Sequence, residues 1–293
     1  MCRLGLATRG NTHLRSEDVE YAIERGLNYL NWCGKPDGLS RAVAGLGKRR
    51  KQTVVAVQFQ ARTPRAAERE FSHILKELRT DFLDIATLYY VESEEEWQQI
   101  VAPGGVWDVL ANLKREGSLR MIGLTTHQRR LAAAWARQAV PEGQGGRADG
   151  SQRASAKKGA GVPPAQNSSF RRHRLDMLMV RYNAAHRGAE REVFPVTTAR
   201  RMPVVTFTGL RWRALLQSTP EDPPGFEPPG AAECYRFCLS HPAVSVSLTA
   251  PGNREQLEEN LRLLEEWRAT ESRAADAIRA HGDRVYRHSG EFW

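Results

Sequence analysis

Four cysteines are the residues of this chain that could form disulfides or hold a metal ion: Cys2, Cys33, Cys234 and Cys238. They contain no C-x-x-C pair and no His/Cys cluster with the spacing of a zinc site. Reduced thiols are the rule for such cysteines in a reducing compartment. We therefore expect neither a disulfide framework nor a structural metal site.

Other residues could bind a phosphate or move a proton. Arg254 stands at the expected start of a helix, where backbone N–H groups and a guanidinium suit a phosphate dianion; a solvated helix face is the alternative. Tyr89 and Tyr90 carry phenols, which titrate near pH ~10 when unassisted. Each would need a neighbouring positive charge to donate a proton readily at neutral pH, and an aromatic rim around a site is the alternative for this pair.

The elements that must position these residues alternate regularly along the chain. Short apolar runs alternate with amphipathic stretches of helical period from Leu4 onward, which predicts βα units and a parallel sheet. The apolar runs predict strands at residues 4–7, 27–31, 54–59, 82–89, 119–124, 176–181, 204–207 and 244–248. About eight strands close a barrel that its own side chains fill. We therefore expect one α/β domain over residues 1–293, a (β/α)8 TIM barrel.

The helix boundaries have signals of their own. Ser16 is a candidate N-cap for a helix that ends at Gly26, and another helix should begin at Pro64. A further helix should end at Gly117, and the last should begin near Asn253. The residues of this last helix that we expect to face inward are Leu257, Leu261 and Leu264.

Two segments interrupt this pattern. Residues 139–173 are rich in small, polar and basic residues and offer almost nothing to bury, so we predict a disordered insertion there. It should leave from the amino-terminal face of the barrel, as a tolerated surface insertion or, alternatively, as a polyanion-binding loop. Residues 218–230, rich in Pro and Gly, follow a strand and are a candidate lid over the active-site face.

Several segments, in the expected order, resemble the aldo-keto reductase superfamily. Residues 22–31 (AIERGLNYLN) are similar to the family's second strand and its approach, and residues 78–85 (LRTDFLDI) to the start of its fourth strand. Residues 117–127 (GSLRMIGLTTH) resemble its pattern G-K-V-R-x-I-G-V-S-N-H. Residues 181–190 resemble the sixth strand and its exit, and residues 242–261 the last strand and the helix that holds the adenine end of NADP. The resemblance implies a TIM barrel of the aldo-keto reductase type, without a Gly-rich Rossmann turn.

The resemblance also implies NADP(H) as the cofactor, bound at the carboxyl ends of the strands. The positions that match those holding the nicotinamide carboxamide are Thr125 and Thr126, and the matching stacking ring is Phe207. The loop that grips the pyrophosphate is matched by Thr208, Leu210 and Arg211. Near the ribose phosphate the matches are Arg254, Gln256 and Asn260. The structural alternatives are strand ends for the threonines, a core position for the phenylalanine and a solvated helix face for the last three.

The catalytic positions of the family are substituted in this chain. Carbonyl reduction needs a proton donor beside the accepting oxygen, and the family uses a Tyr tuned by a Lys, an Asp and a His. Asn31 stands at the Asp position, Gln58 at the Lys position and Tyr89 at the His position. The Tyr position falls on or near Pro36.

Three functions remain open at this point. The first is a divergent oxidoreductase acting on a small carbonyl compound, with Tyr89 or Tyr90 as proton donor and Lys35 as the source of positive charge. The second is a catalytically inactive NADP(H)-binding relative that acts as a sensor or interaction scaffold. The third is different chemistry on the same fold, which would use the acidic run at residues 92–96; such a run is usually a solvated loop or a helix start. His127 is a candidate for either a site role or a surface role.

Composition limits the partners. Charged residues make up 26% of the chain and apolar residues 41%, which is typical of a globular domain. The net charge of +9 is diffuse, so we expect a small-molecule carbonyl substrate and no nucleic-acid partner. The amino terminus lacks a signal-peptide pattern and no apolar run approaches the roughly 20 residues that a bilayer needs, so we expect no membrane and a cytoplasmic location. The oligomeric state stays open.

Overall fold

The computed structural model describes residues 3–8, 14–138, 173–265, 267 and 269–288. Except for His173, the predicted disordered insertion at 139–173 lies outside the described residues. None of the helices within the described part is long and apolar enough to cross a membrane.

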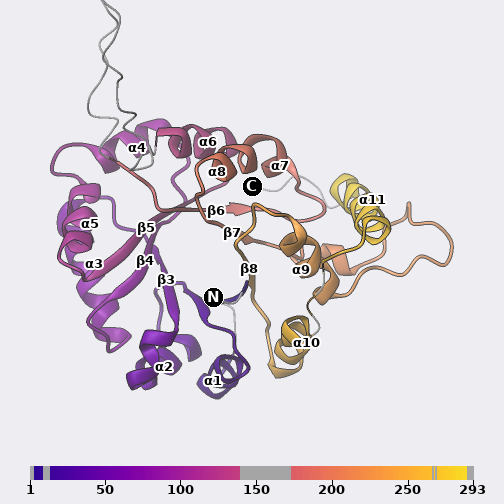
Figure 1. Ribbon diagram of the computed structural model, residues 1–293, viewed down its shortest axis with the longest axis horizontal. Helices are drawn as coiled ribbons and strands as arrows, with labels where there is room; N and C mark the ends of the chain where they lie inside the picture. Colours follow the sequence, from indigo (N-terminus) through magenta and orange to yellow (C-terminus); the bar gives the residue numbers. More distant parts are fainter. Residues whose placement is uncertain (1–2, 9–13, 139–172, 266, 268, 289–293) are drawn as a thin grey trace, which may run out of the picture.

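A closed parallel barrel forms the centre of the fold (Figure 1). Within the described residues its strands are β1 (Leu4–Ala7), β2 (Tyr29–Trp32), β3 (Val54–Phe59), β4 (Leu83–Leu88), β5 (Leu119–Thr126), β6 (Met177–Arg181), β7 (Val204–Phe207) and β8 (Val246–Thr249). Each strand pairs with the next in parallel, and β8 pairs with β1 to close the ring. The predicted (β/α)8 TIM barrel is confirmed.

Helices surround the barrel, with most of the connections between consecutive strands helical (Figure 1). Their bounds are α1 (Ser16–Glu24), α2 (Gly38–Gly45), α3 (Pro64–Glu77), α4 (Glu94–Val101), α5 (Val106–Arg115), α6 (Arg129–Gln138), α7 (Gly188–Glu192), α8 (Phe194–Ala199), α9 (Ala231–Ser240), α10 (Arg254–Glu265) and α11 (Ser272–His288). Two short 3-10 helices, η1 (Gly47–Gln52) and η3 (Ala214–Leu216), lie in the described connections.

The predicted helix boundaries agree with the structure to within one or two residues. Helix α3 begins at Pro64, as predicted, because Thr63 caps it and proline suits the first helical turn. Ser16 is the first residue of α1 rather than its cap, a position taken by Arg15. In α10, Leu263 is buried more deeply than Leu264, which packs at the edge of the core.

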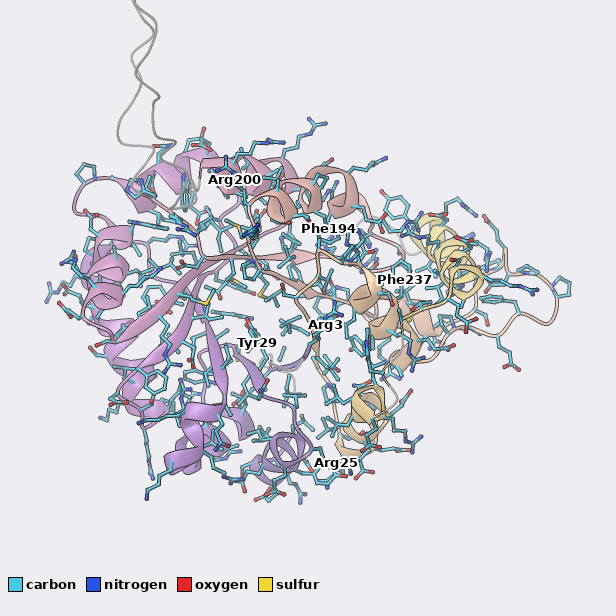
Figure 2. The ribbon with its side chains drawn as sticks, viewed as in Figure 1. Arg3, Arg25, Tyr29, Phe194, Arg200 and Phe237 are labelled. Atoms are coloured by element: carbon cyan, nitrogen blue, oxygen red, sulfur yellow. The ribbon has the colours of Figure 1, made fainter. Side chains whose placement is uncertain are left out.

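Two apolar layers result from the alternation of side chains along the strands. The outer layer lies between strands and helices and contains most of the core. The inner layer fills the barrel itself, with Tyr29, Ile85, Met177 and Val205 among its members. Figure 2 labels Tyr29, which lies within the ring. The barrel is therefore a packed core rather than a pore, and barrels of this kind build their sites at the carboxyl ends of the strands.

Asp84 fastens the amino-terminal side of the barrel. Its carboxylate lies 2.7 Å from Arg50 Nη1 and 2.6 Å from Arg120 Nη1, and it accepts a hydrogen bond from Val55 N at 2.9 Å. Both guanidinium groups also lie over the ring of Phe82. Asp84 and Arg50 are buried, so their charges depend on each other for compensation.

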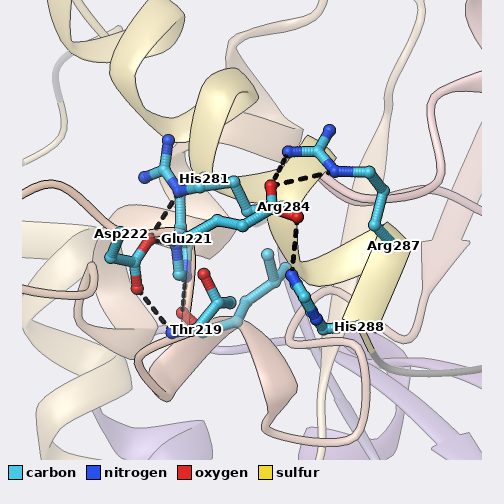
Figure 3. A network of polar contacts seen from close by, with 8 residues as sticks. Thr219, Glu221, Asp222, His281, Arg284, Arg287 and His288 are labelled. Carbon is cyan, nitrogen blue, oxygen red and sulfur yellow. Dashed lines mark hydrogen bonds and ion pairs between the residues drawn. The ribbon is translucent and has the colours of Figure 1, made fainter.

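Helix α11 anchors the chain that follows β7. Asp222 accepts hydrogen bonds from Arg284 Nε and from Thr219 N, each at 2.5 Å (Figure 3). The buried ring of His281 lies 3.3 Å from Asp222 Oδ1 and 3.1 Å from the carbonyl oxygen of Leu215. Burial opposes ionisation of Asp222, but these hydrogen bonds outweigh it and lower its pKa to about 2.

Candidate functional site

A cavity of about 370 Å³ lies at the carboxyl ends of the strands, the end at which such barrels build their sites. Its walls come from β1 to β4 and β6 to β8, from the loops that follow these strands, and from Tyr235 of α9 and Gln256 of α10. The lining residues are Ala7, Asn31, Gln58, Tyr89, Tyr90, Met179, Phe207, Thr208, Gly209, Leu210, Trp212, Arg213, Tyr235, Leu248, Ala250, Gly252 and Gln256. The predicted lid residues, 218–230, lie beside α11 (Figure 1). The residues of the same connection that line the cavity are Thr208, Gly209, Leu210, Trp212 and Arg213.

The cavity brings together four of the five predicted catalytic residues: Asn31, Gln58, Tyr89 and Tyr90. Lys35 is the exception. Its side chain is exposed and is not part of the lining, while its backbone carbonyl accepts a hydrogen bond from the indole Nε1 of Trp32 at 2.8 Å.

Asn31 is completely buried at the inner end of the cavity lining. Its side-chain oxygen and nitrogen both lack a hydrogen-bond partner among the described residues. Leaving a buried polar group unsatisfied costs about 1–3 kcal/mol. An amide with an open donor and an open acceptor is a place where a polar ligand group, such as a carboxamide, recovers that cost.

Four rings form a cluster at the mouth of the cavity. The ring centroid of Tyr90 lies 4.0 Å from that of Tyr89, 4.4 Å from that of His127 and 6.4 Å from that of Phe207. His127 also meets Phe207 edge to face at 5.8 Å. Tyr90 therefore stands in the centre of an aromatic group that contains the predicted nicotinamide-stacking ring.

Glu92 holds His127 in this cluster. The ring Nδ1 of His127 lies 3.0 Å from Glu92 Oε1, and the backbone N–H of His127 donates to the same oxygen at 2.9 Å. Burial raises the pKa of Glu92, but its hydrogen bonds with His127 outweigh this and hold the pKa below its usual value. We did not predict this pair from the sequence, because the two residues follow different strands and lie 35 positions apart.

The rest of the acidic run has structural partners. Glu96 lies 2.6 Å from Arg62 Nε, and Glu94 accepts a hydrogen bond from the indole of Trp135 at 2.9 Å. Ser93 caps α4, so Glu94 and its neighbours occupy the first turn, where carboxylates are favoured by the helix dipole. The acidic run therefore forms the start of a helix, which was one of the structural alternatives for residues 92–96.

Arg181 supplies positive charge near Tyr90, the role that the sequence analysis gave to Lys35. It is half-buried at the end of β6 and pairs in register with Phe207 on β7. Burial lowers its pKa, and the neighbouring phenol of Tyr90 and carboxylate of Glu92 oppose that effect. The sequence contained no signal for this role beyond the position of an arginine at a strand end.

The predicted cofactor residues divide into two groups. Phe207, Thr208, Leu210 and Gln256 line the cavity. The other five do not line it. Thr125, Thr126, Arg211 and Asn260 are buried, and Arg254, the first residue of α10, is half-buried. Among them, the side-chain nitrogen of Asn260 donates to Thr249 Oγ1 at 2.7 Å, and Thr126 Oγ1 accepts from Gln128 N at 2.9 Å.

Arg254, predicted to lie near the ribose phosphate, is already engaged. Its guanidinium lies 3.0 Å from Asp18 Oδ1 and 2.8 Å from Glu258 Oε1. It also stacks over the ring of Tyr21 at 3.4 Å. Both ion-pair partners of the Arg254 guanidinium are carboxylates, so its charge is already compensated in the structure.

The loop after β7 has an unusual backbone. Thr208, Arg211, Trp212 and Arg213 all have positive φ, between 51° and 72°. A non-glycine residue in this region costs about 1–3 kcal/mol and persists only where its surroundings enforce it. Gly209, between them, lies so close to the ring of Tyr235 that a Cβ there would come within 2.9 Å of it.

Thiol and metal chemistry have little support in the described residues. Cys33, Cys234 and Cys238 are buried, and Cys2 lies outside the described residues. Burial raises the pKa of the Cys234 thiol to about 12, so it stays protonated at neutral pH. No group of three or more His, Cys, Asp or Glu side chains in the described part is placed to hold a metal ion.

Comparison with known proteins supports the fold. Neither a family model nor a curated protein matches the sequence. Among solved structures, the chain is similar to the holo form of aldo-keto reductase AKR11C1 from Bacillus halodurans, with 15% identity, a TM-score of 0.66, and coverage of 95% of this chain and 91% of that one. An aldo/keto reductase from Brucella melitensis matches with 14% identity, a TM-score of 0.65, and coverage of 95% and 93%.

The thermostable aldo-keto reductase Tm1743, solved in complex with the inhibitor epalrestat, matches with 18% identity, a TM-score of 0.63, and coverage of 96% of this chain and 95% of that one. The chain therefore has the aldo-keto reductase fold over almost its whole length. At such low identity, the residues of the cavity must supply the argument for function.

Proposed function

We propose that this protein is a divergent aldo-keto reductase, an NADP(H)-dependent oxidoreductase that acts on a small carbonyl compound. One observation carries the proposal: a single cavity at the carboxyl ends of the strands gathers Asn31, Gln58 and Tyr90 with Phe207 and the loop that follows it. These residues come from four strands far apart in the sequence. The closed barrel brings these strand ends to one opening, so the side chains can act on one bound molecule.

The residues present fit the nicotinamide end of the cofactor. Phe207 offers a flat apolar surface, and Asn31 offers an open donor and acceptor of the kind that a carboxamide satisfies. Residues 208–213 would lie against the pyrophosphate, and Gln256 against the adenosine half. Arg254 would hold the 2′-phosphate only after giving up Asp18 or Glu258.

When bound, a reduced nicotinamide supplies a hydride to the carbonyl carbon, and the alcohol product then needs one proton on its oxygen. Tyr90 is our proton donor, because it lines the cavity and its phenol interacts electrostatically with Arg181. A nearby cation stabilises a phenolate and so makes the phenol a better acid at neutral pH. Tyr89, whose ring packs on Tyr90, would position it.

A second function has its own supporting observation. The lining replaces the expected Asp and Lys by the neutral Asn31 and Gln58, and Lys35 is exposed outside the lining. Such a site holds a cofactor without strong assistance to proton transfer. The alternative is therefore an NADP(H)-binding relative without turnover, which senses the cofactor or serves as an interaction scaffold.

Two measurements test the proposal. NADPH and NADH are titrated into the purified full chain while nicotinamide fluorescence and tryptophan quenching are recorded; no saturable change up to millimolar cofactor would remove both functions. If binding is seen, single-turnover oxidation of NADPH with a panel of aldehydes and quinones separates the two. Oxidation supports the reductase, and its absence with every carbonyl compound supports the relative without turnover.

A further inference from the structure

Two hollows adjoin each other at the amino-terminal side of the barrel, the end opposite the cavity. The first, of about 530 Å³, lies between η1 and the end of α3, beside the residues that lead into β3 and β4. The second, of about 700 Å³, lies between α2 and α3. Lys76 and Arg79 line both hollows, so we treat the two as one basic groove.

The cations of the basic groove are open to a ligand. Four of them are exposed and take part in none of the ion pairs among the described residues: Arg41, Lys51, Lys76 and Arg79. The remaining guanidinium of the lining, that of Arg50, is buried and compensated by Asp84. An anionic ligand therefore gains electrostatic attraction from the four without displacing a carboxylate.

The acidic side chains of the lining do not cancel this charge. Asp81 lines the first hollow and Glu77 the second. Glu77 already accepts a hydrogen bond from Ser40 Oγ at 3.2 Å. Two carboxylates thus face four exposed cations, and the basic groove carries an excess of positive charge.

The helix dipole explains only part of this arrangement. Lys76 lies in the last turn of α3 and Arg79 directly after it, where the negative end of the dipole favours cations. Arg41 lies in the middle of α2, outside its last turn, and has no such reason to be there. Arg79 also occupies, with φ of 47°, the left-handed position at which glycine commonly ends a helix. Three elements therefore bring cations to one opening.

The shape and composition of the basic groove favour a small phosphorylated ligand over a macromolecule. Ammonium and guanidinium groups both bind phosphate. Stacked bases of a nucleic-acid strand need an open aromatic face, and the ring of Phe82 already lies under the guanidinium groups of Arg50 and Arg120 at 4.3 Å and 4.2 Å. A bilayer is flat and is bound most firmly by apolar side chains. The large exposed apolar side chains of the described residues all lie outside the groove lining: Trp212, Trp267 and Tyr286.

We propose that the basic groove is a binding site for a small molecule with several phosphate groups, which places phosphates in both hollows with Lys76 and Arg79 between them. A single phosphate reaches the cations of one hollow, whereas a multiply phosphorylated molecule is attracted by all four. The site is independent of the proposed function, because it lies at the opposite end of the barrel from the cavity.

Calorimetry on the purified full chain tests the proposal with four probes: inositol hexakisphosphate, tripolyphosphate, orthophosphate and citrate. Each is titrated with and without NADPH, at low and at raised salt. We expect the first two to bind, and orthophosphate and citrate to be at least about a hundredfold weaker. Affinity for the first two should fall as salt rises, because exposed charges are screened. NADPH should leave each Kd unchanged.

Variants with a matched control assign the binding to residues. Lys76→Gln combined with Arg79→Gln should weaken inositol hexakisphosphate about tenfold or more. Arg65→Gln combined with Arg69→Gln removes the same charge from exposed positions of α3 outside the groove lining, and should leave Kd unchanged.

Two further variants, Arg41→Gln and Lys51→Gln, change the groove without altering α3, and each should weaken binding about threefold. Far-UV circular dichroism and the melting temperature confirm that each variant folds. If Lys76 and Arg79 only complement the helix dipole, their replacement lowers the melting temperature and leaves Kd unchanged, which overturns the proposal.

The remaining outcomes are equally decisive. Equal weakening in the two double variants of α3 would make the binding a response to net charge, and competition between inositol hexakisphosphate and NADPH would place it in the cavity; either result overturns the proposal. So does binding of a short DNA duplex or of phosphatidylserine vesicles without binding of either polyphosphate. If the polyphosphates bind as expected and NADPH does not bind, the proposed function alone is wrong.

Discussion

Glu92 holds His127 by both its backbone and its ring, through one carboxylate oxygen at 2.9 Å from the backbone nitrogen and 3.0 Å from Nδ1. The contact ties the loop after β4 to the end of β5. Because His127 packs on Tyr90, it also fixes the aromatic cluster at the cavity mouth. The same carboxylate thus determines where two neighbouring rings stand.

Removing that carboxylate should loosen the loop. A hydrogen bond to a charged group contributes about 1.5–3 kcal/mol, so Glu92→Ala should speed amide exchange at His127 roughly ten- to a hundredfold. Hydrogen–deuterium exchange of peptides covering β5 and its exit measures this. Glu95→Ala, at an exposed position of α4, is the control and should leave the exchange unchanged.

Tyr90→Phe should reduce single-turnover oxidation of NADPH by about a hundredfold, since positioned proton transfer contributes a factor of that order. NADPH affinity should change little, because the aromatic ring remains. Lys35→Met should have no effect on either quantity, as Lys35 lies outside the cavity lining. Turnover that survives Tyr90→Phe unchanged would exclude Tyr90 as the donor and leave Tyr89→Phe to be tested.

Asp84→Asn should destabilise the barrel by about 3–5 kcal/mol, because it leaves the buried guanidinium of Arg50 without its compensating charge. Urea unfolding followed by circular dichroism measures the change. The matched control is Glu265→Gln, which breaks an exposed pair with Arg25 and should cost less than about 1 kcal/mol. A similar decrease in the free energy of unfolding in the two variants would show that the buried ion pair stabilises the fold no more than the exposed one.

Asp222 should make stability depend on pH in the acid range. Its pKa is about 2 in the folded protein, below the value of about 3.9 in an unfolded chain. A depressed carboxylate pKa adds stability that is fully present above the unfolded value and is lost as pH falls toward 2. Urea melts between pH 5 and pH ~2 should therefore converge for Asp222→Asn and the unmodified chain. A constant gap between them over this range would contradict the assignment.

The sequence predicted the barrel well because each buried strand is a short apolar run. Three strands, β1, β3 and β7, begin and end at the predicted residues. The last strand begins at Val246 rather than at residue 244, because Val244 is apolar but ends a turn, with its N–H bonded to the carbonyl of His241. Apolar character marks burial, and only backbone pairing marks a strand.

The candidate site was harder to predict than the fold. Asn31, Gln58 and Phe207 could be placed, since each lies at or next to the carboxyl end of a strand and matches a position of the family pattern. Glu92 and Arg181 could not, because their partners come from other strands. Trp212 could not either: positive φ is expected at glycine, and nothing in the residue type indicates a left-handed tryptophan.

The filling of the barrel by Tyr29, Ile85 and Met177 has a kinetic consequence. Side chains packed in the ring leave no passage through it, so a ligand of the cavity enters and leaves on the carboxyl-end side of the barrel. A ligand bound against the inner layer would therefore be covered by a second ligand bound nearer to the solvent.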